Sequence, residues 1–135
     1  MIYECTISHC ILDKNGNEKI LKENYIVENE ELFADVEKAA YSEFGQLVNI
    51  DVIAIKRSKL CEIINDRDSD DEFVFIADIA DVQTNDGGEE VEFVYKVALF
   101  ALSMDDAYEK TKHYLKQGFN MSIVGIKKSR IKDLL

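Results

Sequence analysis

Basic side chains concentrate in two short segments of the chain, residues 55–64 and residues 126–135. The segments read IKRSKLCEII and IKKSRIKDLL, and they share an isoleucine, a lysine and a serine at the same spacing. Ammonium and guanidinium groups bind phosphate and carboxylate oxygens, so both segments are candidates for binding an anion. They hold seven of the sixteen Lys and Arg residues: Lys56, Arg57, Lys59, Lys127, Lys128, Arg130 and Lys132.

Two interpretations of these segments stay open. Because they lie 71 positions apart, we expect them at equivalent places in two related units. In the first interpretation they bind a nucleotide, a phosphate group or a nucleic-acid backbone. In the second they protect an exposed strand edge and pair with nearby carboxylates. The first interpretation assigns the ligand site to Lys56, Arg57, Lys59, Lys127, Lys128 and Arg130.

The rest of the chain lacks patterns typical of catalysis. His9 and His113 belong to no recognised motif, and there is no nucleophile elbow, phosphate loop, dinucleotide fingerprint or HExxH. Asp66, Asp68 and Asp70 alternate as in a calcium loop, but the glycine and glutamate that such a loop needs further along are missing. We therefore expect no catalytic residues, no metal site, no cofactor and no enzymatic activity.

The composition is that of an acidic globular protein. The 135 residues are 47% hydrophobic and 32% charged, with a formal net charge of −11. This charge repels nucleic acid and anionic membranes at long range, without excluding a local basic patch. Three cysteines without CxxC spacing predict free thiols. The absence of a signal peptide and of a long apolar run predicts a soluble, cytoplasmic protein without membrane contact.

The first half has the pattern of a strand hairpin, a helix and a third strand. Residues 3–11 alternate between apolar and polar side chains, and residues 20–27 form the returning strand after an Asn-Gly turn. An apolar stripe predicts a helix over residues 33–44, which Gly45 is placed to end in the left-handed conformation. Residues 48–55 are rich in β-branched side chains and predict the third strand.

The second half repeats this order. Residues 73–82 and 91–102 predict a strand hairpin, residues 104–115 carry a helical stripe, and residues 122–127 predict a closing strand. The sequence SMDD at residues 103–106 matches a capping box at the start of the helix.

Matching positions recur 71 to 73 residues apart, which favours an internal duplication. We predict an α+β fold of two tandem ββαβ repeats, residues 1–65 and 72–135, within a single domain. The acidic stretch 65–72 between them should be a solvated linker. The expected architecture is a two-layer sandwich of mixed sheet and two helices. Whether the halves share one sheet or form two sheets is left open.

The motifs also resemble a known family. The opening Tyr3-x-Cys5-x-Ile7 strand, the Tyr25-Ile-Val strand before a helix, the Ile-Lys closing strand and the duplicated plan are similar to domain-of-unknown-function family 4494. That family occurs in gut bacteria of the Bacteroides group and in their phages. The resemblance implies a cytosolic protein from a phage or mobile-element setting, and it carries over no catalytic residues. Ala77 replaces the cysteine that the second copy often repeats.

Two functions fit the sequence. The first is a small non-enzymatic binding protein, expected as a homo-oligomer, whose basic segments bind a nucleotide or nucleic acid and so counter a host defence. The second is an acidic interaction module that engages or inhibits a host or phage protein, for which the net charge of −11 is the support.

Overall fold

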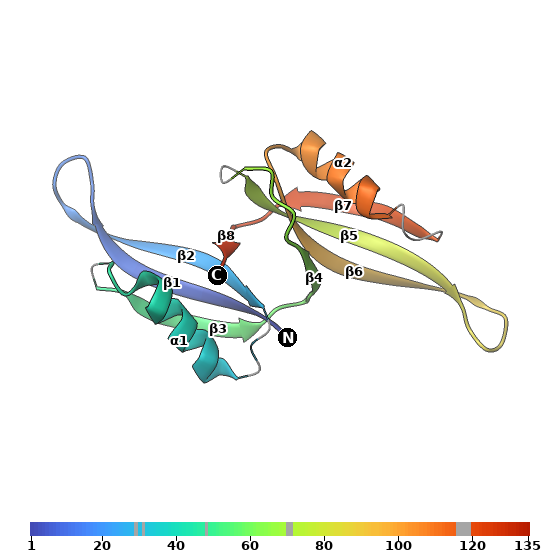
Figure 1. Cartoon of the computed structure of the whole chain (residues 1–135), viewed down its shortest axis with the longest axis horizontal. Coiled ribbons are helices and arrows are strands. Elements are labelled where there is room, and N and C mark those ends of the chain that lie inside the picture. The colour runs from blue at the N-terminus through green and yellow to red at the C-terminus, as the bar shows by residue number, and fades with distance from the viewer. Residues whose placement is uncertain (29, 31, 48, 70–71, 116–119) are drawn as a thin grey trace. The chain divides into compact units, whose positions relative to one another are not determined.

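The computed structural model describes all residues except 29, 31, 48, 70–71 and 116–119. Contacts between residues divide the chain into two compact units. Unit 1 comprises Met1–Lys59 and Ile131–Leu135, and unit 2 comprises Leu60–Arg130. Each unit contains one four-stranded sheet and one helix (Figure 1).

Unit 1 contains β1 (Ile2–Leu12), β2 (Glu18–Glu28), α1 (Phe33–Phe44), β3 (Asp51–Arg57) and β8 (Ile131–Leu134). Its strand order is β3-β1-β2-β8, with β8 parallel to β2 and the other pairs antiparallel. The helix α1 covers one face of this sheet (Figure 1). Alternate residues of β1 are buried, and they form a core with side chains of β2 and the helix. The buried members of this core are Tyr3, Cys5, Ile7, Tyr25, Val27, Val36 and Ala40.

Unit 2 contains β4 (Leu60–Ile64), β5 (Phe73–Thr84), β6 (Glu90–Ala101), α2 (Met104–Leu115) and β7 (Met121–Lys128). Its strand order is β4-β6-β5-β7, with β4 parallel to β6 and the other pairs antiparallel. The core between α2 and the sheet consists of Phe75, Ala77, Ile79, Val97, Leu99, Ala101 and Ala107.

The two units have the same topology. If β1, β2 and β3 are matched with β5, β6 and β7, the strand orders and directions coincide, and β8 takes the place of β4. The predicted α+β class with two helices and mixed sheets is therefore confirmed. The open question about the sheets is also answered, because the chain forms two separate four-stranded sheets.

Each half of the chain contributes a strand to the unit of the other half. After β3 in unit 1, Ser58 and Lys59 lead directly into β4, which pairs with β6 in unit 2. After β7 in unit 2, Ser129 and Arg130 lead into β8, which pairs with β2 in unit 1. The repeated segments therefore contain a strand end, a two-residue connection and an exchanged strand. The sequence analysis did not separate these exchanged strands.

The two connections begin in the same way. The Ser58 amide donates a hydrogen bond to the Ile2 carbonyl, and the Ser129 amide donates to the Val74 carbonyl, each at 2.9 Å. Both bonds extend the pairing of an edge strand by one step. The serine shared by the two repeated segments thus marks the last paired position before the chain changes units.

The predicted helix signals give mixed results. The capping box is confirmed, since the Asp106 amide donates to the Ser103 hydroxyl at 3.2 Å and the Leu102 amide to the Asp106 carboxylate at 3.0 Å. The left-handed conformation expected of Gly45 is wrong, because its φ is −60°. Glycine is favoured there by space instead, since a Cβ would lie 2.6 Å from the Tyr41 carbonyl oxygen.

Candidate functional site

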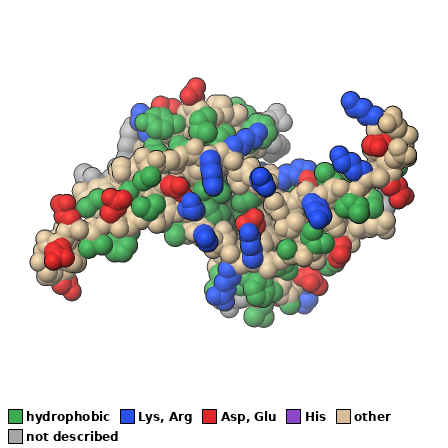
Figure 2. Space-filling model, turned by 180° about the vertical axis from the view of Figure 1, so that it is seen from behind, with side chains coloured by type: hydrophobic (Ala, Val, Ile, Leu, Met, Phe, Trp, Pro, Cys, Tyr) green, Lys and Arg blue, Asp and Glu red, His purple; other side chains and the backbone are tan. Residues whose placement is uncertain are grey.

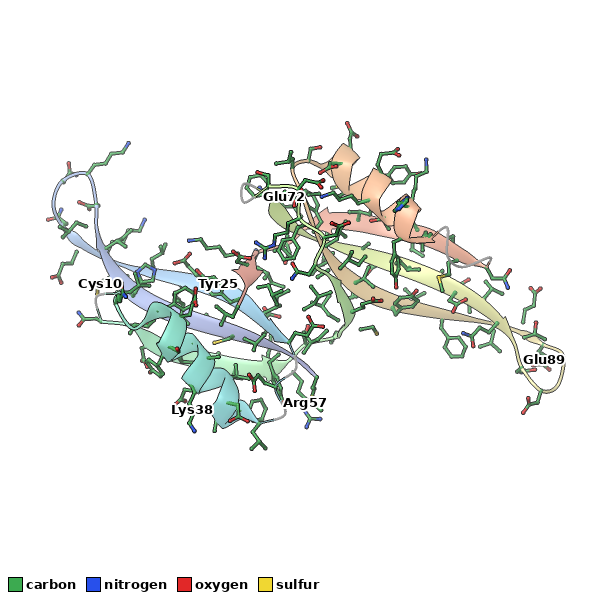
Figure 3. The ribbon with its side chains drawn as sticks, viewed as in Figure 1. Cys10, Tyr25, Lys38, Arg57, Glu72 and Glu89 are labelled. Atoms are coloured by element: carbon green, nitrogen blue, oxygen red, sulfur yellow. The ribbon has the colours of Figure 1, made fainter. Side chains whose placement is uncertain are left out.

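Three of the predicted site residues lie at the end of β3 in unit 1. Lys56 and Arg57 are the last residues of that edge strand, and Lys59 lies in the connection to β4 (Figure 3 labels Arg57). All three are exposed. Lys56 is the one member with an ion pair among the described residues, to Glu4 at 3.9 Å, and its own side chain is 71% exposed. A pair so long and so exposed neutralises little of the charge.

The other three lie at the equivalent place in unit 2. Lys127 and Lys128 end the edge strand β7, and Arg130 lies in the connection to β8. All three are exposed, and the space-filling view in Figure 2 shows Lys and Arg side chains, in blue, standing out from the surface. The ammonium group of Lys128 lies 3.7 Å above the centre of the Phe73 ring, a cation–π contact that leaves its charge intact.

These positions bear on both interpretations of the basic segments. The segments do end edge strands, which is the place that edge protection requires. The expected pairing with carboxylates is largely missing, however, since Arg57, Lys59, Lys127 and Arg130 have no ion pair within the described part of the chain. Lys132, the seventh basic residue, differs from the rest because it forms an ion pair with Glu23 on β2.

Unit 2 also contains a pocket that the sequence analysis did not find. Its volume is about 520 Å³, and it lies between α2, the end of β6 and the segment that follows β4. Ile64, Leu99 and Phe100 supply apolar surface, and the polar lining is mainly acidic. The polar lining residues are Asp66, Asp68, Asp106, Glu109, Lys110, His113 and Tyr114.

Lys110 is the one lysine among the pocket's lining residues, and acceptors surround it. Its ammonium group lies 2.7 Å from Glu72 Oε1, 2.9 Å from the Phe100 carbonyl oxygen and 3.3 Å from Asp68 Oδ2. Burial alone would lower the pKa of Lys110, but the hydrogen bonds to the Glu72 and Asp68 carboxylates raise it. The charge of Lys110 is therefore neutralised by carboxylates of its own unit. The other acidic lining residues leave the rim of the pocket with an excess of negative charge.

Glu72 ties the acidic linker to this cluster. It precedes β5 (Figure 3), its side chain is only 1% exposed, and its Oε1 also accepts the Asp68 amide at 3.3 Å. Its Oε2 has no hydrogen-bond partner among the described residues. The predicted solvated linker is thus anchored at Asp68 and Glu72. Asp70, the third aspartate of the calcium-like spacing, lies outside the described residues.

Unit 1 contains a second buried polar cluster, centred on Glu23. His9 Nε2 lies 2.6 Å from Glu23 Oε1, the Tyr25 hydroxyl donates to Glu23 Oε2 at 3.2 Å, and Lys132 of β8 also pairs with this carboxylate. Burial alone would raise the pKa of Glu23, but the hydrogen bonds from Lys132 and His9 lower it. Burial and the nearby Glu23 charge raise the pKa of Tyr25. The cluster therefore holds β8 against β2.

Among the described residues, the two clusters supply neither a metal-binding group nor an accessible thiol. No group of three or more His, Cys, Asp or Glu side chains in the described residues is suited to hold a metal ion. Cys5 is fully buried, and burial followed by the charge of Glu37 raises its pKa, so the reactive thiolate is disfavoured. The exposed Cys61 lies on β4, outside both clusters.

Sequence reasoning found the basic segments but missed the pocket and the Glu23 cluster. Lys110, Glu72 and Asp68 are separated by up to 42 positions, and His9, Glu23 and Lys132 by up to 123. No local spacing relates them. One signal pointed to the Glu23 cluster. His9 is a polar side chain on an otherwise apolar strand face, since it continues the buried alternation of Tyr3, Cys5 and Ile7.

Comparison with known proteins gives a family but no activity. None of the helices in the described residues is both long and apolar enough to cross a membrane. No curated protein matches the chain. A family model, Domain of unknown function (DUF4494), matches residues 1–135, in agreement with the resemblance seen in the sequence. The chain therefore belongs to the DUF4494 family.

Proposed function

We propose that this protein is a non-enzymatic binding protein whose basic segments bind an anionic ligand. The observation that carries the proposal is the state of the six charges: all are exposed, and only Lys56 has an ion pair within the described residues, at 3.9 Å. In a chain with 27 acidic side chains, cations on a surface would ordinarily be expected to meet carboxylates. These cations remain available for a phosphate or another multivalent anion.

The positions of the residues support this use. Each segment presents three cations within four residues at the end of an edge strand, where the backbone is held by the Ser58 or Ser129 hydrogen bond. A cation on an ordered backbone loses less conformational freedom on binding than one on a free loop. A nucleotide or a nucleic-acid backbone is the ligand class proposed. The phage setting and the role against a host defence stay predictions.

Charge reversal in one segment is expected to weaken anion binding at least tenfold. The variant Lys127→Glu/Arg130→Glu replaces two attractive charges with two repulsive ones, and no ion pair in the described structure is broken by it. Binding of a nucleotide panel and of a short single-stranded DNA is measured by isothermal calorimetry at low salt. The affinity of the unmodified protein should fall as salt rises, because the exposed charges are screened.

A matched variant distinguishes the effect of charges in the basic segment from the effect of the net charge of the protein. Lys14→Glu/Lys19→Glu makes the same change of net charge at exposed positions of the β1–β2 hairpin and should bind nearly as the unmodified protein does. If both variants lose the same affinity for the anion, the loss is due to net charge and not to the basic segment. No binding by the unmodified protein to any of these anions would count against the proposal as a whole.

The pocket of unit 2 favours a second candidate, an interaction module that engages a protein partner through its acidic surface. An acidic rim over an apolar floor fits the alkyl chain and charged end of a lysine or arginine from a basic segment of that partner. Asp66 and Glu109 lie at this rim and are exposed. Acidic side chains also occur far from the pocket, as on the β5–β6 hairpin whose Glu89 is labelled in Figure 3.

Neutralising the rim is expected to weaken this second interaction severalfold. A lysine decapeptide serves as the probe, and Asp66→Asn/Glu109→Gln removes two charges at the pocket. Asp86→Asn/Glu89→Gln removes two from the hairpin instead and is the control. Fluorescence anisotropy at low salt should show weaker binding only for the pocket variant. Equal behaviour of both variants would show that the pocket has no part in the interaction.

A further inference from the structure

The edge of β2 in unit 1 is an acceptor for a parallel strand that comes from elsewhere in the chain. Asn24, Tyr25 and Ile26 of this edge are aligned with Ile131, Asp133 and Leu134 of β8. The Leu135 amide adds a hydrogen bond to the Ile26 carbonyl at 2.9 Å. The acceptor therefore recognises a segment of only five residues, by backbone pairing along one edge.

Side chains make this recognition specific. Lys132 reaches the Glu23 carboxylate, which His9 and Tyr25 hold in place from the neighbouring positions of the sheet. Leu135 packs against the core between the sheet and α1. Every one of these contacts lies within unit 1 and depends only on residues 131–135 and their acceptor.

We propose that this acceptor also binds β8 of a second copy of the chain, so that two copies pair by reciprocal exchange of β8. The contacts with β2, Glu23 and the core are the same whichever copy supplies the strand. Two residues, Ser129 and Arg130, connect β7 to β8, and a short hinge connection of this kind invites exchange of a strand between copies. Exchange of an identical element is a common route to a dimer, because it needs no new interface. The homo-oligomer expected from the sequence would arise in this way.

Concentration decides between the two forms. Closure within one chain benefits from the local concentration of a tethered strand, which for a short tether is on the order of millimolar. Exchange between copies should therefore increase with protein concentration during folding, whereas closure within a chain should not.

A disulfide trap distinguishes the two forms in the full chain. Asn24 and Ile131 are aligned neighbours on β2 and β8, and neighbouring strands lie about 4.8 Å apart, within the range that a disulfide spans. Asn24→Cys/Ile131→Cys is prepared with Cys10→Ser and Cys61→Ser, so that of the natural thiols only the buried Cys5 remains. The protein is refolded at concentrations from about 1 μM to about 1 mM and then oxidised.

The expected result is a covalent dimer on non-reducing gels, in a fraction that grows with concentration. The single variants Asn24→Cys and Ile131→Cys in the same background are the controls and should give no such dimer. A cross-linked monomer alone at every concentration would overturn the proposal. If the first pair does not oxidise, Ile26→Cys/Leu134→Cys, another aligned pair of the same two strands, provides the same readout.

The unmodified protein gives an independent measurement. Unlabelled and ¹⁵N-labelled chains are mixed, unfolded and refolded together at high concentration, and native mass spectrometry should detect a mixed dimer. Only monomers, or dimers that also form undiminished in a variant lacking residues 131–135, would contradict an exchange of β8. Because neither experiment uses a ligand, failure of anion binding and failure of strand exchange remain distinguishable.

Discussion

Lys110→Met is expected to lower the free energy of unfolding by about 3 kcal/mol, the lower end of the range for breaking a buried ion pair. The substitution removes the group that neutralises Glu72, whose side chain is 1% exposed, while the aliphatic part of the side chain is retained. It also deprives the Phe100 carbonyl of its hydrogen bond from Lys110. Glu72 would then remain as a buried charge that has lost its ammonium partner, or would have to take up a proton.

The measurement is urea unfolding followed by circular dichroism, with Lys112→Met as the matched control. Lys112 lies on the same helix but is exposed and pairs with the exposed Glu109 at 3.8 Å, so its loss should cost less than about 1 kcal/mol. Adding Glu72→Gln to Lys110→Met removes the uncompensated charge and should restore part of the stability. Equal stability of the Lys110 and Lys112 variants would show that the buried pair is not formed in solution.

The stabilisation by the Lys110 ion pair depends on pH, in a direction set by the shift of the Lys110 pKa. The pKa of Lys110 is raised above its ordinary value of 10.5, so the stabilisation is fully present below 10.5 and is lost as the pH rises through the folded-state value. At neutral pH the network is therefore intact, and the cost of Lys110→Met should not change between pH 6 and 9.

Glu23→Gln is expected to cost about 2 kcal/mol and to loosen β8 in particular. The substitution keeps the shape of the side chain but removes the charge that Lys132, His9 and Tyr25 share, and hydrogen bonds to a charged group each contribute about 1.5–3 kcal/mol. The expected loss is set below the sum of three such bonds because glutamine can still accept hydrogen bonds, and because the Lys132 side chain is 60% exposed.

Amide hydrogen exchange provides the local readout, because the Leu135 amide is bonded to the Ile26 carbonyl only while β8 is docked. That amide should lose protection in Glu23→Gln, whereas the α2 amides of unit 2 should not. Glu4→Gln is the control, since within the described residues the Glu4 carboxylate forms only the long pair with Lys56. Unchanged protection of Leu135 would mean that the cluster does not hold β8.

Low pH should loosen β8 in the same way as Glu23→Gln does. The pKa of Glu23 lies below its ordinary value of 4.5, so its contribution is present above 4.5 and is lost as the pH falls through the folded-state value. The unmodified protein should therefore lose the protection of Leu135 on acidification before unit 2 unfolds. In Glu23→Gln this dependence on pH should be absent.

Local patterns predicted most of the elements but not how they assemble. The alternation of Tyr3, Cys5 and Ile7 identified β1 and its buried face, and the Ser103 capping box identified the start of α2. Such signals are local, since each depends on neighbours within a few residues. The exchanged strands β4 and β8 are four or five residues long and pair in parallel with distant strands, so no local pattern distinguishes them from loops.

The candidate site, too, could be predicted only where its residues are neighbours in the sequence. The basic residues are contiguous in sequence, and both segments could be found by inspection. What they bind depends on which carboxylates lie near them, and that is a property of the folded chain: Lys132 finds Glu23, whereas Lys127 and Arg130 find no acidic partner in the described residues. The pocket in unit 2 requires Lys110 to meet Glu72 from a separate element, which composition cannot reveal.

The division of the chain into two units also determines which unit is completed first during translation. Unit 2 is continuous, from Leu60 to Arg130, so all of its strands have left the ribosome once residue 130 has emerged. Unit 1 is made first but remains incomplete, because its edge strand lies at residues 131–134. During translation the β2 edge is therefore exposed for the whole time that unit 2 is being made. A newly completed chain therefore meets unfilled β2 edges on the nascent chains of the same messenger RNA, and that is where an exchange of β8 would begin.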